Sequence, residues 1–204
     1  MTSFAQGLAQ GAPQPGFGDA VFDSQASFRA LLDALARPGE IRAMTLPLTA
    51  PAPLSPAATA LALTLFDHDT PVWLDAGAVV GEVPGFLAFH CGCPVVDETE
   101  RAAFALISAP AAMPPLHGFA VGEDRYPETS TTLVIDVQAL AGGTPVRLSG
   151  PGIADVAVVA PVGLPGAFWE QMRANRGLFP LGVDVVLAAG GQVLGLPRTV
   201  RSEV

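Results

Sequence analysis

Apolar side chains recur at helical spacing in four stretches of the chain. The first predicted helix is capped by Asp23 or Ser24 and ends at Pro38-Gly39. The apolar positions that form one face of this helix are Phe28, Leu31, Leu32 and Leu35. The second predicted helix starts at Ser55-Pro56 and ends near Phe66, and its Ala and Leu residues on most faces indicate burial nearly all round. Two more helices are predicted over residues 84–90 and 166–177.

Short runs of apolar and β-branched residues lie between these helices and predict strands. The expected strands span residues 40–46, 71–75, 103–107, 131–137, 144–148, 156–159, 183–188 and 192–196. Gly190-Gly191 separates the last two and is typical of a β-hairpin. The order of helices and strands predicts one α/β domain over residues 21–204, with a mixed β-sheet flanked by helices. Residues 1–20 are rich in Gly, Gln, Ala and Pro and nearly uncharged, which predicts a disordered tail.

The composition indicates that this chain has partners. Hydrophobic residues make up 50% of its 204 residues, charged residues only 14%, and the mean hydropathy is +0.44. A chain with so few charges has difficulty covering its surface with polar groups, and extended exposed apolar patches usually mark contacts. We therefore expect a large subunit interface rather than a monomer.

The charged residues exclude several classes of function. The net charge of −9 disfavours binding to nucleic acid or to anionic membrane surfaces, since both are negatively charged. All ten basic residues are Arg, so a Schiff base and a Walker A loop, which both need Lys, are excluded. The uncharged run over residues 43–66 contains four Pro residues, which argues against a membrane helix. With no signal peptide pattern, and with Cys91 and Cys93 too close together for a disulfide, we expect a cytoplasmic location.

The polar residues from Asp67 to Thr70 are the first candidate site. Asp67, His68 and Asp69 could supply metal ligands where a predicted helix meets a predicted strand. Against this, adjacent residues seldom converge on one ion. The alternative is a tight turn in which Asp69 and Thr70 bind backbone N–H groups. His90-Cys91-Gly92-Cys93 is a second metal candidate, but no further Cys or His pair completes a zinc site, and buried thiols beside a helix-capping His are the alternative.

Three further motifs have anion binding as one interpretation. Gly150-Pro151-Gly152 follows a strand as a phosphate loop would, but it lacks the third Gly and its Pro removes an N–H donor, which favours a structural turn. Arg176 either binds an anion or stabilises the C-terminal end of its helix. Arg198-Thr199 follows a predicted strand, and Arg198 either binds an anion or pairs with Asp184 or Glu203. A nucleophilic Ser has no supporting G-x-S-x-G motif.

Several motifs of this chain occur in the order found in one family of bacterial proteins. In the N-terminal half they are Phe28-Arg29-x-Leu31-Leu32, Arg37-Pro38-Gly39, Leu63-Thr64-Leu65, Asp67-x-Asp69-Thr70-Pro71-Val72-Trp73-Leu74, and Phe89-His90 with Pro94. In the C-terminal half they are Leu148-Ser149-Gly150-Pro151-Gly152-Ile153, Phe179-Pro180-Leu181-Gly182-Val183-Asp184 and Leu196-Pro197-Arg198-Thr199. With these motifs the chain resembles the PhnH family, subunits of the bacterial carbon–phosphorus lyase system, from about Val21 to its end. None of the motifs encodes a reaction by itself.

The resemblance implies a role in the use of phosphonates as a phosphorus source. Family members sit in a cytoplasmic core complex with PhnG, PhnI and PhnJ, and they form a homodimer when isolated. PhnI, helped by PhnG, PhnH and PhnL, displaces adenine from MgATP with an alkylphosphonate and gives a ribose 1-phosphonate 5-triphosphate. PhnJ, a radical SAM enzyme with an iron–sulfur cluster, later cleaves the carbon–phosphorus bond. The implied fold resembles that of pyridoxal-phosphate-dependent transferases, without the cofactor.

Two of these implications agree with the residue composition. A chain without Lys cannot form an internal aldimine with pyridoxal phosphate, and two Cys cannot hold a cluster that needs three or four thiolates. We therefore expect no cofactor on this chain, with MgATP, SAM and the iron–sulfur cluster on partner subunits.

Three functions remain as hypotheses, and no catalytic residue is assigned. The first is a structural subunit of the complex that forms the ribose triphosphate product. The second is a direct ligand-binding or catalytic contribution to that transfer step. Its candidate contacts are Arg176, Arg198, Thr199, Asp67, Asp69 and Thr70. The third, a freestanding metallohydrolase using His68, His90 and Cys93, has the least support.

Overall fold

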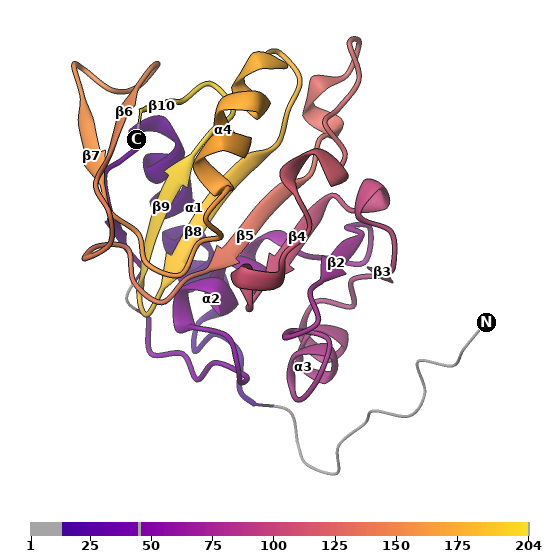
Figure 1. Cartoon of the computed structure of the whole chain (residues 1–204). Helices are drawn as coiled ribbons and strands as arrows, with labels where there is room; N and C mark the ends of the chain where they lie inside the picture. Colours follow the sequence, from indigo (N-terminus) through magenta and orange to yellow (C-terminus); the bar gives the residue numbers. More distant parts are fainter. Residues whose placement is uncertain (1–13, 45, 204) are drawn as a thin grey trace.

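A seven-stranded mixed sheet runs through the centre of the molecule, with helices on both faces (Figure 1). The structure is a computed structural model that describes residues 14–44 and 46–203. The strands of this sheet are β1 (Arg42–Ala43), β2 (Val72–Leu74), β3 (Val95–Val96), β4 (Phe104–Ile107), β5 (Thr132–Asp136), β8 (Asp184–Ala189) and β9 (Gln192–Leu196). Their order is β1-β9-β8-β5-β4-β2-β3. The five strands from β8 to β3 are parallel, β9 is antiparallel to β8, and β1 is antiparallel to β9. The predicted α/β class and mixed sheet are confirmed.

The helices lie in two groups on either side of the sheet. They are α1 (Ala20–Ala36), α2 (Pro56–Leu65), α3 (Val83–His90) and α4 (Phe168–Gly177). One hydrophobic core joins α1, α2 and α3 to one face of the sheet, and a second core joins α4 to the other face. Within the described residues, none of the helices has both the length and the apolar character needed to cross a membrane.

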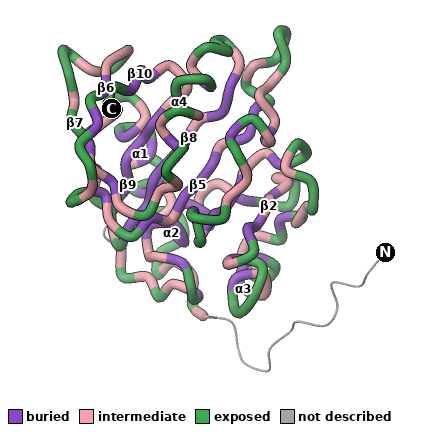
Figure 2. The backbone as a smooth tube through the Cα atoms, viewed as in Figure 1, coloured by how far each residue is buried: buried purple, intermediate pink, exposed green. Residues whose placement is uncertain are grey.

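The central strands send alternate side chains into these two cores. In β8, Val186 and Ala188 belong to the core with α1 to α3, whereas Val185 and Leu187 belong to the core with α4. When helices cover both faces of a parallel sheet, water reaches neither face, and the strands are almost continuously apolar. The buried colour along β5, β8 and β9 in Figure 2 follows from this arrangement.

A second, three-stranded antiparallel sheet lies beside the first. Its strands are β6 (Val146–Ser149), β7 (Ala157–Val159) and β10 (Arg201–Glu203), in the order β10-β6-β7. Strands β6 and β7 were predicted, but β10 and the separation into two sheets were not. β10 reads Arg-Ser-Glu, with only Ser202 buried, so it carries no apolar signal of a strand.

Helix α2 follows the local signals closely. The Ser55 hydroxyl accepts a hydrogen bond from the Ala58 N–H at 3.2 Å, and Pro56 occupies the first helical position, as predicted. Its residues from Ala57 to Ala62 are all buried, which agrees with the predicted burial on most faces.

Helix α1 differs from its prediction in start and in buried face. It starts at Ala20, where Asp19 accepts from two backbone N–H groups, rather than at Asp23 or Ser24. Its buried residues are Ser27, Leu31 and Ala34, while two residues of the predicted face, Phe28 and Leu32, are 45% and 50% exposed.

The reason for the different face is a close approach of α1 to β9. A Cβ atom on Gly195 of β9 would lie 2.5 Å from the Ala34 carbonyl oxygen. Backbones this close require small side chains, so small Ser27 and Ala34 are buried beside Leu31, whereas Phe28 and Leu32 lie on the exposed side of the helix.

Two other predictions meet the structure only in part. Of residues 40–44 and 46, the described part of the predicted strand over residues 40–46, only Arg42–Ala43 forms a strand paired with β9. Of the predicted tail over residues 1–20, the first thirteen residues lie outside the described part. Phe17 packs against the first core, and the Gln14 carbonyl lies 2.9 Å from His90 Nε2.

Candidate functional site

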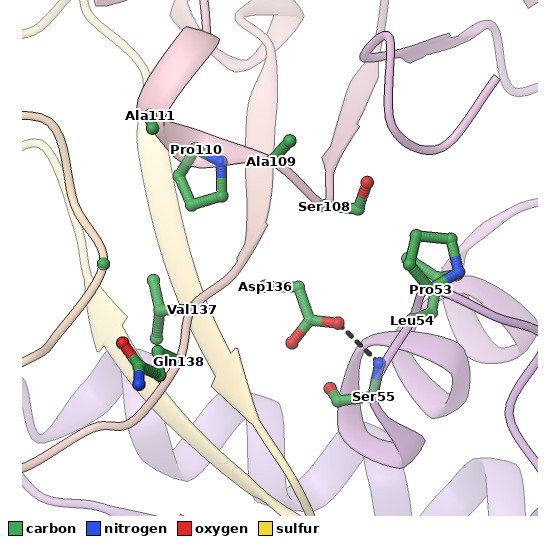
Figure 3. Close-up of a pocket in the computed structure, with 11 residues that line it drawn as sticks. Pro53, Leu54, Ser55, Ser108, Ala109, Pro110, Ala111, Asp136, Val137 and Gln138 are labelled. Carbon is green, nitrogen blue, oxygen red and sulfur yellow. Dashed lines mark hydrogen bonds between the residues drawn. The ribbon is translucent and has the colours of Figure 1, made fainter. Parts of the chain in front are cut away.

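A pocket of about 430 Å³ opens where strands β4 and β5 end (Figure 3). It is lined by Pro53, Leu54, Ser55, Ser108, Ala109, Pro110, Ala111, Asp136, Val137, Gln138 and Gly163. Ligands of open α/β sheets bind outside the carboxyl ends of the parallel strands. The volume also falls in the range of roughly 300–1,000 Å³ that is typical of small-molecule sites. Position and size together make this pocket the candidate site.

Asp136 is the acidic group of the pocket and the last residue of β5. One carboxylate oxygen, Oδ2, accepts a hydrogen bond from the Ser55 N–H at 2.5 Å. Figure 3 shows the other oxygen turned away from this bond, into the space between Ser55 and Gln138. Burial raises the pKa of Asp136 above its ordinary value, although the hydrogen bonds from Ser55 act against this. No Arg or His is among the described residues that line the pocket, so the carboxylate has no cationic partner there.

The N-terminus of α2 also borders the pocket, but its N–H groups are already bound. The Ser55 N–H donates to Asp136, and the Ala58 N–H donates to the Ser55 hydroxyl. The Ala57 N–H donates to the Gly190 carbonyl at 2.8 Å. A helix N-terminus attracts anions through unpaired N–H groups, so this one is not prepared for a phosphate.

Asp75, which follows β2, holds the wall of the pocket in place. It is only 4% exposed, and its carboxylate accepts from the Ala78 N–H at 2.8 Å, the Ser108 hydroxyl at 3.0 Å and the Ala109 N–H at 2.7 Å. Ser108 and Ala109 line the pocket just beyond β4. Through its bonds to Ser108 and Ala109, Asp75 therefore holds the loop after β4 in place.

Sequence reasoning did not single out Asp75 or Asp136. Both were placed inside predicted strands, at or near their carboxyl ends. An acidic residue at that end of a predicted parallel strand is a usable signal, because those ends meet along one edge of the sheet. To use this signal one must know the order of the strands in the sheet, and the local sequence pattern does not give that order.

The polar residues from Asp67 to Thr70 form a turn between α2 and β2. Asp67 accepts from the Asp69 N–H at 3.0 Å and from the Thr70 hydroxyl at 2.6 Å. These two bonds, with that from Thr70 the stronger, lower the pKa of Asp67. The turn interpretation holds, but the residue that organises the turn is Asp67 and not Asp69. Asp69 and His68 are more than 80% exposed, with 3.2 Å between their side chains.

Arg198 lies at the edge of the sheet where the parallel strand β8 begins, opposite the edge with the pocket. Its guanidinium makes a bidentate ion pair with Asp184, the first residue of β8, with N···O distances of 2.6 and 3.2 Å. It also donates to the Ser130 hydroxyl at 2.5 Å and to the Pro127 and Pro180 carbonyls. The pairing with Asp184, one of the two interpretations of Arg198, is thus present.

Arg176 and Thr199 lie near this edge and contact each other. The Arg176 Nε–H donates to the Thr199 carbonyl at 3.1 Å, and its guanidinium lies 5.2 Å from the centre of the Phe179 ring. The structure brings Arg176 and Thr199 together but does not bring them, Arg198 or the Asp67–Thr70 turn into the pocket. Ligand binding by these six residues stays a prediction.

The contacts of the remaining candidates, the His90–Cys93 motif and the Gly150–Gly152 turn, are those of structural residues. Burial raises the pKa of the Cys91 thiol to about 12 and also raises that of Cys93. His90 packs against the Phe86 ring. Residues 14–44 and 46–203 contain no group of three or more His, Cys, Asp and Glu arranged to hold a metal. Gly152 has φ of +83° and lies so close to the end of α1 that no Cβ would fit, as a structural turn requires.

Comparison with known proteins assigns the chain to a family. The model of a family described as bacterial phosphonate metabolism protein PhnH matches residues 15–203. The chain is 47% identical over 187 residues to the subunit PhnH of α-D-ribose 1-methylphosphonate 5-triphosphate synthase from Rhizobium meliloti (strain 1021), covering 92% of this chain and 94% of that protein. It is 38% identical over 79 residues to the HtxG protein of Stutzerimonas stutzeri, covering 39% of this chain and 40% of HtxG. The chain therefore belongs to the PhnH family of bacterial phosphonate metabolism proteins.

Proposed function

We propose that this chain is a subunit of the complex that forms α-D-ribose 1-methylphosphonate 5-triphosphate during phosphonate breakdown, and that its main role is structural. The observation that carries the proposal is the 47% identity to a subunit of that synthase over 92% of the chain. In the proposed step, adenine is displaced from MgATP by an alkylphosphonate. The bond-breaking chemistry belongs to partner subunits.

The proposed partners are PhnG, PhnI and PhnJ, with PhnL in the first step and a homodimer when the chain is isolated. In this proposal the complex is cytoplasmic, and SAM and the iron–sulfur cluster belong to PhnJ. The fold is proposed to resemble pyridoxal-phosphate-dependent transferases without the cofactor. The absence of Lys from the sequence agrees with loss of that cofactor.

Exposed apolar residues on α1 support an assembly role. Val21, Phe28 and Leu32 follow one another at helical spacing, and they are 74%, 45% and 50% exposed. Several exposed apolar side chains on the outside of one helix are typical of a contact with another protein. Because the polar groups of Arg198 and Asp75 are engaged inside the domain, the outer face of α1 is a better candidate contact than either of them.

The test is co-purification with tagged PhnG, PhnI and PhnJ after co-expression. We expect the wild-type chain to be retained and the double variant Phe28→Asp/Leu32→Asp to be lost. Val158→Asp, at an exposed apolar position on β7, is the matched control and should be retained. A wild-type chain that stays free of these subunits would contradict the proposed function, whereas retention of the α1 variant would contradict only the choice of surface.

A second candidate function is a direct contribution to ligand binding in the same transfer step. The pocket at the carboxyl ends of β4 and β5 favours it, because a purely structural subunit does not need a partly buried acid in an open cavity. The sequence-derived contacts, Arg176 and Arg198, lie elsewhere. A growth test on phosphonate with Arg198→Ala checks their part in it.

A further inference from the structure

We propose that the pocket binds the hydroxyl-bearing face of a sugar, and that Asp136 accepts hydrogen bonds from these hydroxyl groups. The inference goes beyond an assembly role for the chain. It rests on the proposed function only in the choice of ribose, carried by a nucleoside, among the sugars.

The charge of the pocket excludes a phosphate or phosphonate group beside Asp136. The carboxylate is the charged side chain among the residues that line the pocket, and those residues include no Arg or His to offset it. The N–H groups at the start of α2, which would otherwise attract an anion, are bound to Asp136, to the Ser55 hydroxyl and to the Gly190 carbonyl. A ligand here must therefore offer hydrogen-bond donors rather than negative charge.

The polar atoms that remain available match hydroxyl groups. One Asp136 oxygen faces the open space of the pocket (Figure 3), where it can accept. The Ser55 hydroxyl is already engaged, since it accepts from the Ala58 N–H and donates to Asp136. The Gln138 side chain offers both an acceptor and donors. Sugar hydroxyl groups donate and accept at once, so they satisfy such a mixed set, while a simple cation would satisfy only Asp136.

The walls of the pocket leave room for a ring. Pro53, Leu54 and Pro110 present apolar surfaces, while Ala109 and Gly163 keep the space open. The loop that carries Gly163 is held against β5 by the hydrogen bond from the Gln138 N–H to the Val162 carbonyl at 3.0 Å. A volume of about 430 Å³ with apolar sides and a few convergent polar groups is typical of a site for a small ring compound.

The position of Asp136 agrees with this chemistry. In nucleotide-binding α/β domains, an acidic side chain near the carboxyl end of a parallel strand binds the ribose hydroxyl, while a glycine-rich turn and a helix N-terminus bind the phosphate. Here the acidic residue is present at the end of β5, and the helix N-terminus beside it is internally bound. The arrangement therefore keeps the part that recognises a sugar and lacks the part that recognises a phosphate.

The experiment is calorimetric titration of the full chain with adenosine, 2′,3′-dideoxyadenosine, adenine and inorganic phosphate. We expect adenosine to bind, and the dideoxy compound and adenine to bind at least about tenfold more weakly, because their contacts with the carboxylate are missing. Inorganic phosphate should not bind. Absence of adenosine binding at millimolar concentration, or equal binding of adenine, would overturn the proposal.

Two variants place the ligand in the pocket. Asp136→Asn retains an oxygen that can accept from the Ser55 N–H but loses the charge, and it should weaken adenosine binding about tenfold. Asp124→Asn makes the same change at an exposed residue before β5, beyond the opposite edge of the sheet, and should leave binding unchanged. Thermal melting of each variant verifies folding, and equal binding by wild type and Asp136→Asn would overturn the proposal.

The outcome is separable from that of the proposed function. If the chain co-purifies with PhnG, PhnI and PhnJ but does not bind adenosine, only the proposed sugar site is contradicted. If it binds adenosine through Asp136 but does not co-purify, only the proposed assembly role is contradicted.

Discussion

The central sheet has one edge at which its parallel strands begin and another at which they end. The charged residues at these two edges differ in how fully their hydrogen-bonding groups are used. At the edge where β8 begins, the Arg198 guanidinium is shared among Asp184, Ser130 and two backbone carbonyls. At the edge where β5 ends, Asp136 is hydrogen-bonded to Ser55 and faces an open pocket whose described lining residues include no Arg or His. The first edge is closed by its own polar groups, and the second has unused hydrogen-bonding capacity.

Residue type alone is therefore a poor guide to the candidate site of this protein. In the sequence, Arg198 after a predicted strand is a candidate for anion binding. In the structure, its guanidinium is bound by groups of the same domain. The pocket is lined mainly by small neutral residues, which have no distinctive sequence pattern. A buried ion pair stabilises the fold only while both partners are present, so removing one partner distinguishes the two edges.

The largest effect is expected from Asp184→Ala at the closed edge. The Arg198 side chain is only 13% exposed, and it would be left without its anion. We expect a loss of unfolding free energy on the order of 3 kcal/mol, measured by urea denaturation. Asp33→Ala removes the exposed ion pair with Arg37 and serves as control, with an expected loss below about 0.5 kcal/mol. Equal losses for the two variants would show that the Arg198 network has no special weight.

A smaller effect is expected from Asp75→Ala behind the pocket. The variant leaves the Ala78 and Ala109 N–H groups and the Ser108 hydroxyl without their acceptor. We expect a loss of about 2 kcal/mol, while Ser108→Ala, which removes one of these bonds, should cost about 1 kcal/mol. Urea denaturation of both variants measures this. A harmless Asp75→Ala change would mean that the wall of the pocket does not depend on Asp75.

The smallest effect concerns the pH dependence of stability at Asp136. Because burial raises its folded pKa above the ordinary value of 3.8, the folded state keeps the proton longer than the unfolded state does. Stability contributed by this group is therefore lost as pH rises from about 4 through the folded pKa, and it stays lost above that. We expect unfolding free energies between pH 3 and pH 7 to fall less for Asp136→Asn than for the wild type.

The comparison residue for this measurement is Asp67, whose pKa is lowered by its bonds to Thr70 and Asp69. Its contribution is present above the unfolded pKa and is lost as pH falls through the folded pKa, so Asp67→Asn should change the profile in the opposite direction. The same trend for both variants would contradict the assigned environment of Asp136.

The fold was predictable where the signals are local. Ser55-Pro56 determined the start of α2, and Gly190-Gly191 marked the hairpin between β8 and β9. The face of α1 was not predictable, because it depends on Gly195 of a strand far away in the sequence. Strand β10 was missed for a related reason: its polar residues form a strand only because β6 offers a partner edge.

The sequence predicted two polar features that lie outside the candidate site. These are the turn between α2 and β2, which Asp67 organises, and the pair of Arg198 with Asp184. The pocket was not predicted, because it combines the ends of β4 and β5 with the loop before α2 and the loop at Gly163. Which strand ends meet at one edge is decided by the strand order, and that order is set by tertiary packing.

The most direct test of the contrast between the two edges is an NMR titration of the ¹⁵N-labelled full chain with adenosine. The account predicts that amide shifts change around Ser55, Ser108, Asp136 and Gln138, and that the amides of Arg198 and Thr199 do not move. Shift changes centred on Arg198 and Thr199, with Asp136 and its neighbours unaffected, would contradict it.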